Sequence, residues 1–246
     1  MKVLPAKPQT KPSRGKRLER YASIAIILTI LVLTFVTGMT YRYNGETERA
    51  GSFAIYKGDT EKKEAALMFN VYEGAENVVK ILDILRKYSA KATFFIGGVW
   101  AEKNSDVLLA ITLAGQELGS HGYLHKDHAQ LSIRQNKEEI AISSRLIENV
   151  TGQPVTLFAP PSGSFGDNTE EACKALGMKM ILWTKDTIDW RDTDVDLLVK
   201  RATKNIAPGD MILMHPKDQT VLALPRIIEA YQKEGYELLT VGKLLN

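Results

Sequence analysis

Hydrophobic residues recur in short runs from about residue 65 onward, and longer amphipathic stretches separate these runs. In one such stretch, Val78, Ile81, Leu82 and Leu85 follow the spacing of a helix with one apolar face. The short runs have the length of buried strands. We predict strands at residues 65–70, 92–96, 116–120, 156–159, 179–182, 211–214 and 237–240.

This alternation of strands and helices predicts one α/β domain over residues 64–246. Strands joined by helices require right-handed crossovers, so the sheet is expected to be parallel. Seven such units in about 180 residues predict an incomplete seven-stranded (β/α) barrel. An open doubly wound sheet is the alternative.

A different hydrophobic segment lies near the N-terminus. Residues 21–41 contain an apolar run long enough to cross a hydrocarbon core of ~30 Å as a helix. Residues 1–20 carry seven Lys and Arg against one acid, Glu19. The positive-inside rule then predicts a single-pass protein of the cell membrane, with a cytoplasmic basic tail (1–20), a transmembrane helix (21–41) and an extracellular C-terminal domain. A cleaved signal peptide is the alternative, but no Ala-x-Ala site follows the run.

Between this segment and the domain, residues 42–63 are polar and predict a linker, with one short strand at 52–56. The net charge is +3, and the basic tail accounts for the excess. Nucleic acid is therefore not expected as a partner. Cys173 is the only cysteine, so no intramolecular disulfide can form, and its apolar neighbours predict a place in the core.

Candidate chemistry gathers at the carboxyl ends of the predicted strands, where β/α barrels place their functional residues. His121 and His125 follow one strand, four residues apart, and His215 follows another. Neutral imidazole is the commonest protein ligand for a divalent metal, so His121 and His125 predict a metal site, with surface histidines as the alternative. His128 lies in the loop after this pair and is expected to be exposed.

Several ordered motifs resemble the polysaccharide deacetylases of carbohydrate esterase family four, which share the NodB-homology domain. The resemblance covers about residues 65–245 and is closest to a branch found in spore-forming bacteria. It is carried by Lys91-Ala-Thr-Phe-Phe-Ile-Gly-Gly98, Gly119-Ser-His-Gly-Tyr-Leu-His125, Phe158-Ala-Pro-Pro-Ser-Gly163, Trp183-Thr-Lys-Asp-Thr-Ile-Asp-Trp190 and Ile212-Leu-Met-His215.

The resemblance implies metal-dependent hydrolysis of acetamido groups on an N-acetylated cell-wall glycan, with peptidoglycan as the expected polymer. It implies a divalent metal, Zn²⁺ by preference, held by His121 and His125, with His215 protonating the departing amine. Asp186 and Asp189 belong to the motif that orients the catalytic base in this family.

Two departures from the family pattern weaken this expectation. The family's first strand ends in Thr-Phe-Asp-Asp-Gly, with a base and a metal ligand, whereas this chain has Asn70 and Val71 there. Ala159 replaces the arginine that orients the base, which agrees with the cost of several kcal/mol for a buried unpaired charge. Glu76 could supply a new base, although an acid there could equally stabilise a helix N-terminus.

The remaining candidates are substrate contacts. We expect Asn70, Pro160, Pro161 and Trp190 to line the glycan site and Trp183 to lie in the core. The sequence thus predicts a membrane-anchored deacetylase-like protein of weak activity, because losing a general base typically costs about 10²–10⁴ in rate. The alternative is an inactive pseudoenzyme that binds glycan or an envelope partner.

Overall fold

The computed structural model describes residue 29 and residues 53–246. The predicted basic tail, the predicted transmembrane helix except Thr29, and linker residues 42–52 lie outside this part of the chain. Among the residues described, no helix is both long and apolar enough to cross a membrane. Residues 53–246 belong to one compact unit, separate from the N-terminal part of the chain, and this second unit contains the predicted α/β domain.

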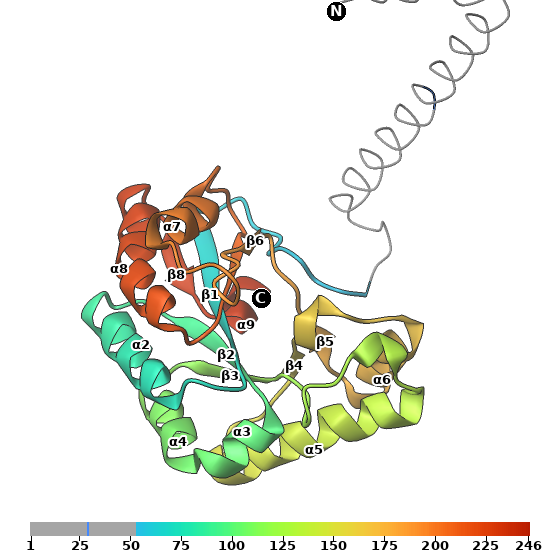
Figure 1. The fold of residues 1–246 in the computed structure, drawn as a ribbon. Helices are drawn as coiled ribbons and strands as arrows, with labels where there is room; N and C mark the ends of the chain where they lie inside the picture. Colours follow the sequence, from blue (N-terminus) through green and yellow to red (C-terminus); the bar gives the residue numbers. More distant parts are fainter. Residues whose placement is uncertain (1–28, 30–52) are drawn as a thin grey trace, which may run out of the picture. The chain divides into compact units, whose positions relative to one another are not determined.

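Parallel strands form the centre of this second unit (Figure 1). Their order is β5-β4-β3-β2-β1-β7-β6, with β8 also pairing with β1. All seven predicted strands have a counterpart, and β6 is an additional short strand. The strands are β1 (Glu64–Val71), β2 (Ala92–Ile96), β3 (Glu117–Ser120), β4 (Leu157–Phe158), β5 (Lys179–Met180), β6 (Lys185–Asp186), β7 (Met211–Met214) and β8 (Glu237–Leu239).

No pairing joins β5 to β6 among the described strands, so the barrel is incomplete, as predicted. The segment before β1 lies between the two sides of this gap. Ile55 forms a bridge with Ile181 just after β5, and the Gly58 N–H donates to the Gly209 carbonyl ahead of β7. Of the short strand predicted at 52–56, the described residues 53–56 contain only this bridge.

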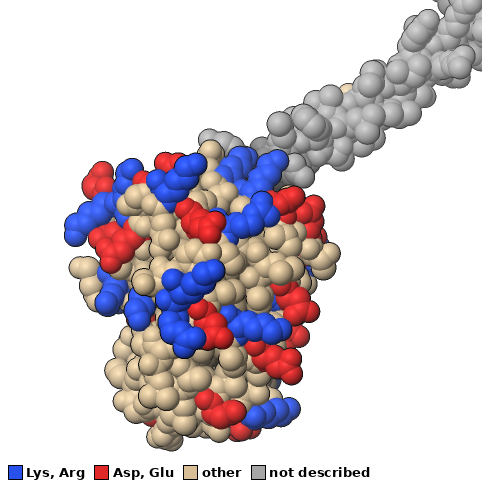
Figure 2. Space-filling model, turned by 90° about the vertical axis from the view of Figure 1, so that its left-hand side faces the viewer, with Lys and Arg blue, Asp and Glu red and all other residues tan. Residues whose placement is uncertain are grey.

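Helices cover the outer face of the strands (Figure 1). They are α2 (Ala75–Lys87), α3 (Gly98–Lys103), α4 (Ser105–Leu113), α5 (Ile133–Thr151), α6 (Asp167–Leu176), α7 (Val195–Thr203) and α8 (Asp218–Lys233), with short 3₁₀ turns η1 (His128–Gln130) and η2 (Pro161–Gly163). The last helix, α9 (Val241–Leu244), instead packs Val241 and Leu244 against residues on the inner side of the strands. Over the face shown in Figure 2, Lys and Arg side chains are mixed with Asp and Glu.

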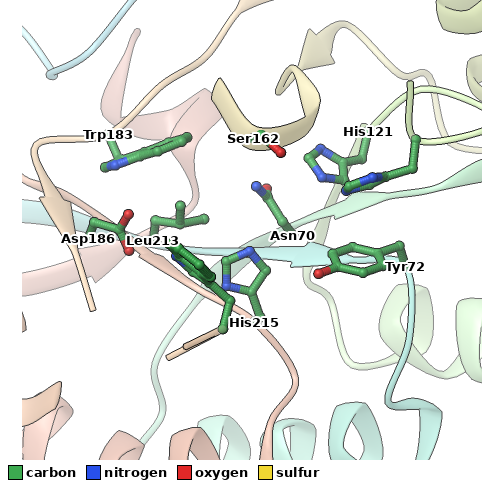
Figure 3. Close-up of a pocket in the computed structure, with 10 residues that line it drawn as sticks. Asn70, Tyr72, His121, Ser162, Trp183, Asp186, Leu213 and His215 are labelled. Atoms are coloured by element: carbon green, nitrogen blue, oxygen red, sulfur yellow. The ribbon is translucent and has the colours of Figure 1, made fainter. Parts of the chain in front are cut away.

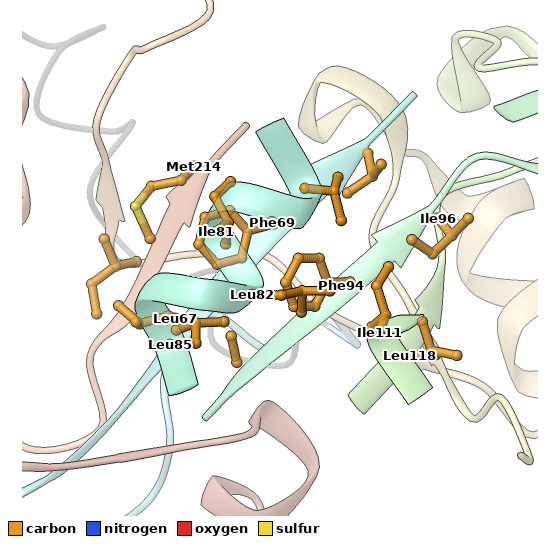
Figure 4. Packing of buried hydrophobic residues seen from close by; sticks show 14 of the residues in the cluster. Leu67, Phe69, Ile81, Leu82, Leu85, Phe94, Ile96, Ile111, Leu118 and Met214 are labelled. Atoms are coloured by element: carbon orange, nitrogen blue, oxygen red, sulfur yellow. The ribbon is translucent and has the colours of Figure 1, made fainter. Parts of the chain in front are cut away.

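Two apolar layers result from the alternation of side chains along each strand. Leu67 and Phe69 of β1 face outward and pack with Ile81 and Leu85 of α2 (Figure 4). Cys173 is buried in this outer layer, as predicted, and burial raises the pKa of its thiol to about 12. The inner layer contains Ala66, Met68, Phe95, Leu157, Ala159, Ile181, Met211 and Leu213.

The inner layer explains the glycine in the middle of β3. A Cβ on Gly119 would lie 2.6 Å from the Phe95 ring and 3.1 Å from the Leu157 carbonyl oxygen. The same inward rows then continue past the strand ends. Two residues beyond Met68, Gly119 and Leu213 stand Asn70, His121 and His215, so the pleat brings these three side chains toward one space.

Candidate active site

A cavity of about 390 Å³ opens at the carboxyl ends of the strands (Figure 3). Its wall combines imidazoles, an amide, a carboxyl group and three aromatic rings, whereas no Lys or Arg side chain of the described residues contributes to it. The lining residues are Asn70, Tyr72, His121, His125, Ser162, Trp183, Asp186, Trp190, Leu213 and His215.

His121 and His125 present a pair of imidazoles with centroids 5.0 Å apart. His121 is buried, and its Nδ1–H donates to the Ala159 carbonyl at 2.7 Å, which leaves the Nε2 lone pair free. Burial lowers the pKa of His121 well below its usual value, and it lowers that of His125 as well. Both rings are therefore neutral near pH 7, the state in which imidazole binds metal.

This donor set fits a divalent metal through two protein ligands. Among the described residues, no third His, Cys, Asp or Glu joins the pair to form a larger cluster. Val71 lies at the end of β1, where the family resemblance implies a carboxylate ligand, and its side chain is buried in the outer apolar layer. A metal held here would therefore have fewer protein ligands than structural sites usually provide.

The loop that carries the two histidines is held by a buried acid on α5. Glu139 Oε2 accepts the backbone N–H groups of Tyr123 and Leu124 at 3.0 and 2.7 Å, and Lys126 forms an ion pair with Oε1 at 3.0 Å. Gly122 begins this turn with φ of 74°, and a Cβ there would lie 2.9 Å from His128 Nε2. The close approach and the positive φ together require glycine.

His128 corrects a prediction, because it is fully buried rather than exposed. Its Nδ1–H donates to Asn136 Oδ1 at 2.6 Å, and its ring packs on Phe158 with centroids 4.9 Å apart. The position of His128 in a loop predicted an exposed side chain, but the 3₁₀ turn η1 folds this side chain back under the loop that carries His121 and His125. Nε2 of His128 has no hydrogen-bond partner among the described residues.

His215 and Asp189 form a second polar unit, of which His215 lines the pocket. Asp189 is fully buried, and its Oδ1 accepts from His215 Nδ1–H at 2.7 Å. Its Oδ2 accepts from the His215 backbone N–H at 2.6 Å and from the Thr220 hydroxyl at 2.5 Å. Asp189 thus fixes the tautomer of His215 without lining the pocket itself, and it leaves His215 Nε2 as the nitrogen free of this pairing.

The amide of Asn70 stands where the resemblance implies a catalytic carboxylate. Asn70 is 2% exposed, and its amide points into the pocket between His121 and Trp183 (Figure 3). Its Oδ1 is buried without a hydrogen-bond partner among the described residues. Ala159 is fully buried in the inner layer, so no guanidinium reaches the pocket from that strand end. An amide cannot accept a proton from water at neutral pH, and Asn70 therefore supplies no base.

Asp186 is the only carboxylate on the pocket wall formed by the described residues. Burial raises the pKa of this carboxyl group above its usual value, and its Oδ1 accepts the Ile188 backbone N–H at 2.7 Å. Glu76, the predicted replacement base, is exposed in the first turn of α2 and does not line the pocket.

The predicted substrate contacts divide into two groups. Trp190 lines the pocket and is 52% exposed, as a platform for a sugar requires. Pro160 and Pro161 are buried and do not line the pocket, which the neighbouring Ser162 does instead. Trp183, predicted to lie in the core, is half-buried and contributes to both the apolar layers and the pocket wall.

Tyr72 is a pocket residue that the sequence reasoning missed. Its ring centroid lies 4.2 Å from that of His125 and 6.3 Å from those of His121 and His215, and burial raises the pKa of its phenol. The signal was present in the sequence, because Tyr72 continues the inward series of Met68 and Asn70 one step beyond the strand.

The comparisons agree with this fold. Residues 57–181 match the polysaccharide deacetylase family model. A peptidoglycan-N-acetylglucosamine deacetylase of Bacillus cereus is 30% identical over 81% of this chain and 96% of its own length. The chain therefore belongs to the polysaccharide deacetylase family.

Two further relatives are similar to this chain, and the second bears on activity. The uncharacterized protein YlxY of Bacillus subtilis is 38% identical over 192 residues, which cover 78% of this chain but only 60% of that protein. The crystal structure of a pseudoenzyme of carbohydrate esterase family four from Bacillus anthracis matches with a TM-score of 0.76 and 39% identity, over 78% of this chain and 69% of that one. A mutant of that pseudoenzyme is described as having restored enzymatic activity.

Proposed function

We propose that this protein binds cell-wall glycan in the pocket and has lost most of the hydrolytic activity of its family. The observation that carries the proposal is Asn70, a neutral amide at the end of β1 beside the paired imidazoles. A general base typically contributes about 10²–10⁴ in rate, so its replacement leaves binding with little turnover. The similarity to a pseudoenzyme supports the same conclusion.

Glycan binding is supported by the composition of the pocket wall. Trp190, Trp183 and Tyr72 offer the aromatic faces on which sugar rings stack, and the polar side chains among them can accept hydrogen bonds. Relatives with the same fold are named as deacetylases of peptidoglycan, which makes a cell-wall polymer the expected partner.

A slow deacetylase is the second candidate, and Asp186 is the observation that favours it. In this case His121 and His125 hold the metal, and His215, oriented by Asp189, gives its proton to the departing amine. A bound Zn²⁺ supplies polarisation of an acetyl carbonyl. Asp186 is then the one carboxylate of the described pocket wall available to accept a proton from water.

Acetate release separates the two candidates. Purified full-length protein is incubated with zinc and N-acetylglucosamine oligomers or peptidoglycan, and acetate is measured against the Asp186→Asn variant. The glycan-binding proposal predicts retention of the protein on peptidoglycan, with acetate release at least about 100-fold below that of an active relative. Fast release by the wild type that is abolished in the variant would establish the deacetylase instead.

We also propose that residues 21–41 anchor the protein in the cell membrane and that the domain lies outside the cell. The proposal rests on the apolar run and on the seven basic residues that precede it. Such a topology would hold the pocket near the cell wall.

A further inference from the structure

We propose that the pocket selects glycan whose amino groups are free, and binds deacetylated glucosaminyl units as their ammonium form in preference to N-acetylated units. The inference rests on the proposed glycan-binding function and specifies the chemical form of the ligand. It is carried by an unpaired carboxylate, an unpartnered amide oxygen and the absence of cations from the pocket wall that the described residues form.

The carboxylate is that of Asp186. It accepts one backbone N–H, from Ile188, and no Lys or Arg among residues 53–246 forms an ion pair with it. The neighbouring Asp189 differs, because each of its oxygens accepts from His215 and one also accepts from Thr220. Asp186 therefore has hydrogen-bonding capacity and negative charge that the domain itself does not satisfy.

Nearby cations are engaged elsewhere. Arg201, which acts on Asp186 through space, donates to the Thr187 carbonyl at 2.9 Å and to Asp192 at 2.6 Å. Lys185 forms an ion pair with Asp210 at 3.3 Å. Ala159, where the family resemblance implies an arginine, adds no charge. A cationic ligand is thus the group that would neutralise Asp186.

The amide oxygen is Oδ1 of Asn70, which is buried and lacks a donor among the described residues. Asn70 lines the same pocket as Asp186 (Figure 3). An unsatisfied buried acceptor is costly, and a ligand N–H group that reaches it recovers this cost. An ammonium group carries three such donors and an acetamido group only one.

The other residues that line the pocket also favour a positively charged ligand. No Lys or Arg side chain of the described residues lines this wall, so none competes with a cationic ligand there. Trp190 lines the same wall, and an aromatic face attracts cations. The Arg191 guanidinium, 5.8 Å from the Trp190 centroid, is itself paired with Asp192 at 2.8 Å. An N-acetylated unit can use the aromatic faces but leaves the charge of Asp186 uncompensated.

Calorimetric titration tests the preference. Full-length protein is titrated with a fully deacetylated glucosamine tetramer and with the N-acetylglucosamine tetramer, at slightly acidic pH so that the glycan amines are protonated. Chelator is present, because a bound dication would repel the ammonium group. The wild type is expected to bind the deacetylated tetramer about tenfold more tightly or better, as one charge-assisted hydrogen bond provides.

Two variants locate the effect. Asp186→Asn keeps an acceptor for the Ile188 N–H and is expected to fold but to lose the preference. Asp106→Asn removes an exposed charge in the first turn of α4 and should retain it. Thermal melting verifies that both variants fold.

Three results would overturn the inference: equal affinity of the wild type for the two tetramers, no binding of the deacetylated tetramer at millimolar concentration, or an unchanged preference in Asp186→Asn. The acetate measurement remains independent, because fast acetate release would refute the proposed loss of hydrolysis while the titrations still decide the preferred form.

Discussion

The carboxylate of Asp189 holds both the side chain and the backbone of His215. Its Oδ1 lies 2.7 Å from His215 Nδ1 and its Oδ2 lies 2.6 Å from the His215 backbone nitrogen, although the two residues are 26 positions apart. The pair joins the loop after β6 to the end of β7. His215 thus enters the pocket in one orientation and one tautomer.

Asp189→Asn is expected to destabilise the domain because the amide offers one acceptor oxygen where the carboxylate offers two. At least one of the N–H groups of His215 would lose its partner in a buried site, at a cost of about 1–3 kcal/mol in the free energy of unfolding. Urea denaturation measures this loss. Asp186→Asn is the matched control and should lower the free energy of unfolding much less. Equal losses in the two variants would show that the hydrogen bonds to His215 do not account for the effect.

His121→Ala and His125→Ala should each lower divalent-metal affinity by more than about tenfold, because each change leaves the metal with only one of its two imidazole ligands. Zinc is the expected ion, because nitrogen ligands suit it, and cobalt or nickel would also fit. Competition with a chromogenic chelator gives the affinity. His128→Asn serves as the comparison, because His128 lies near the loop but outside the pocket. Full zinc occupancy in the double alanine variant would place the site elsewhere.

Stability of the metal-free domain should fall as the pH drops below about 6.5. Burial lowers the folded-state pKa of His128 below its unfolded value of 6.5, so the unfolded chain binds more protons in this range. The slope approaches about 1.4 kcal/mol per pH unit for each such histidine. His121 and His125 add to it, because their pKa values are also lowered.

Urea unfolding in chelator, at pH values on both sides of 6.5, measures this dependence. His128→Asn keeps a donor for Asn136 but cannot take up a proton, so part of the slope should disappear in this variant. An identical slope in the two proteins would mean that His128 does not contribute.

Asn70→Asp combined with Ala159→Arg should raise deacetylase activity more than either change alone. Asn70→Asp restores a carboxylate near the paired imidazoles without its orienting partner, and Ala159→Arg alone buries an unpaired cation that destabilises the fold. The double-mutant cycle isolates the coupling between the two positions. Glu76→Gln is the control, because Glu76 is exposed and outside the pocket. Additive effects would contradict the coupling between the two positions. Fast acetate release by the wild type would contradict the proposed loss of hydrolytic activity.

Protease added to intact cells should digest the domain after residue 42 and spare the basic tail. The expectation follows from the charge asymmetry across residues 21–41. Tags at the two ends of the chain, detected separately on a blot, report the outcome. Replacing the seven Lys and Arg of the tail by neutral residues should weaken the orientation. Protection of the domain in intact cells would refute the extracellular topology.

The sequence by itself determined the succession of strands and helices along the chain, the parallel sheet and the pairing of His121 with His125. These features follow from local signals, because the period of the apolar residues is set by strand and helix geometry, and the spacing of two imidazoles is visible in one segment. With the resemblance to the family, it also identified the losses at Asn70 and Ala159, since the family pattern has a carboxylate and an arginine at these positions.

Tertiary structure decided which of these residues share a pocket and what they touch. His128 and Glu76 differ in burial because η1 folds inward whereas the first turn of α2 faces solvent, and neither fact can be read from a loop position. Trp183 and Tyr72 joined the site through the inward rows of separate strands. Asp186 and Asp189 are three residues apart, yet one is unpaired and the other holds His215. That difference arises because Asp189 meets β7 and α8, contacts whose partners lie far away in sequence and are brought together only when the sheet forms.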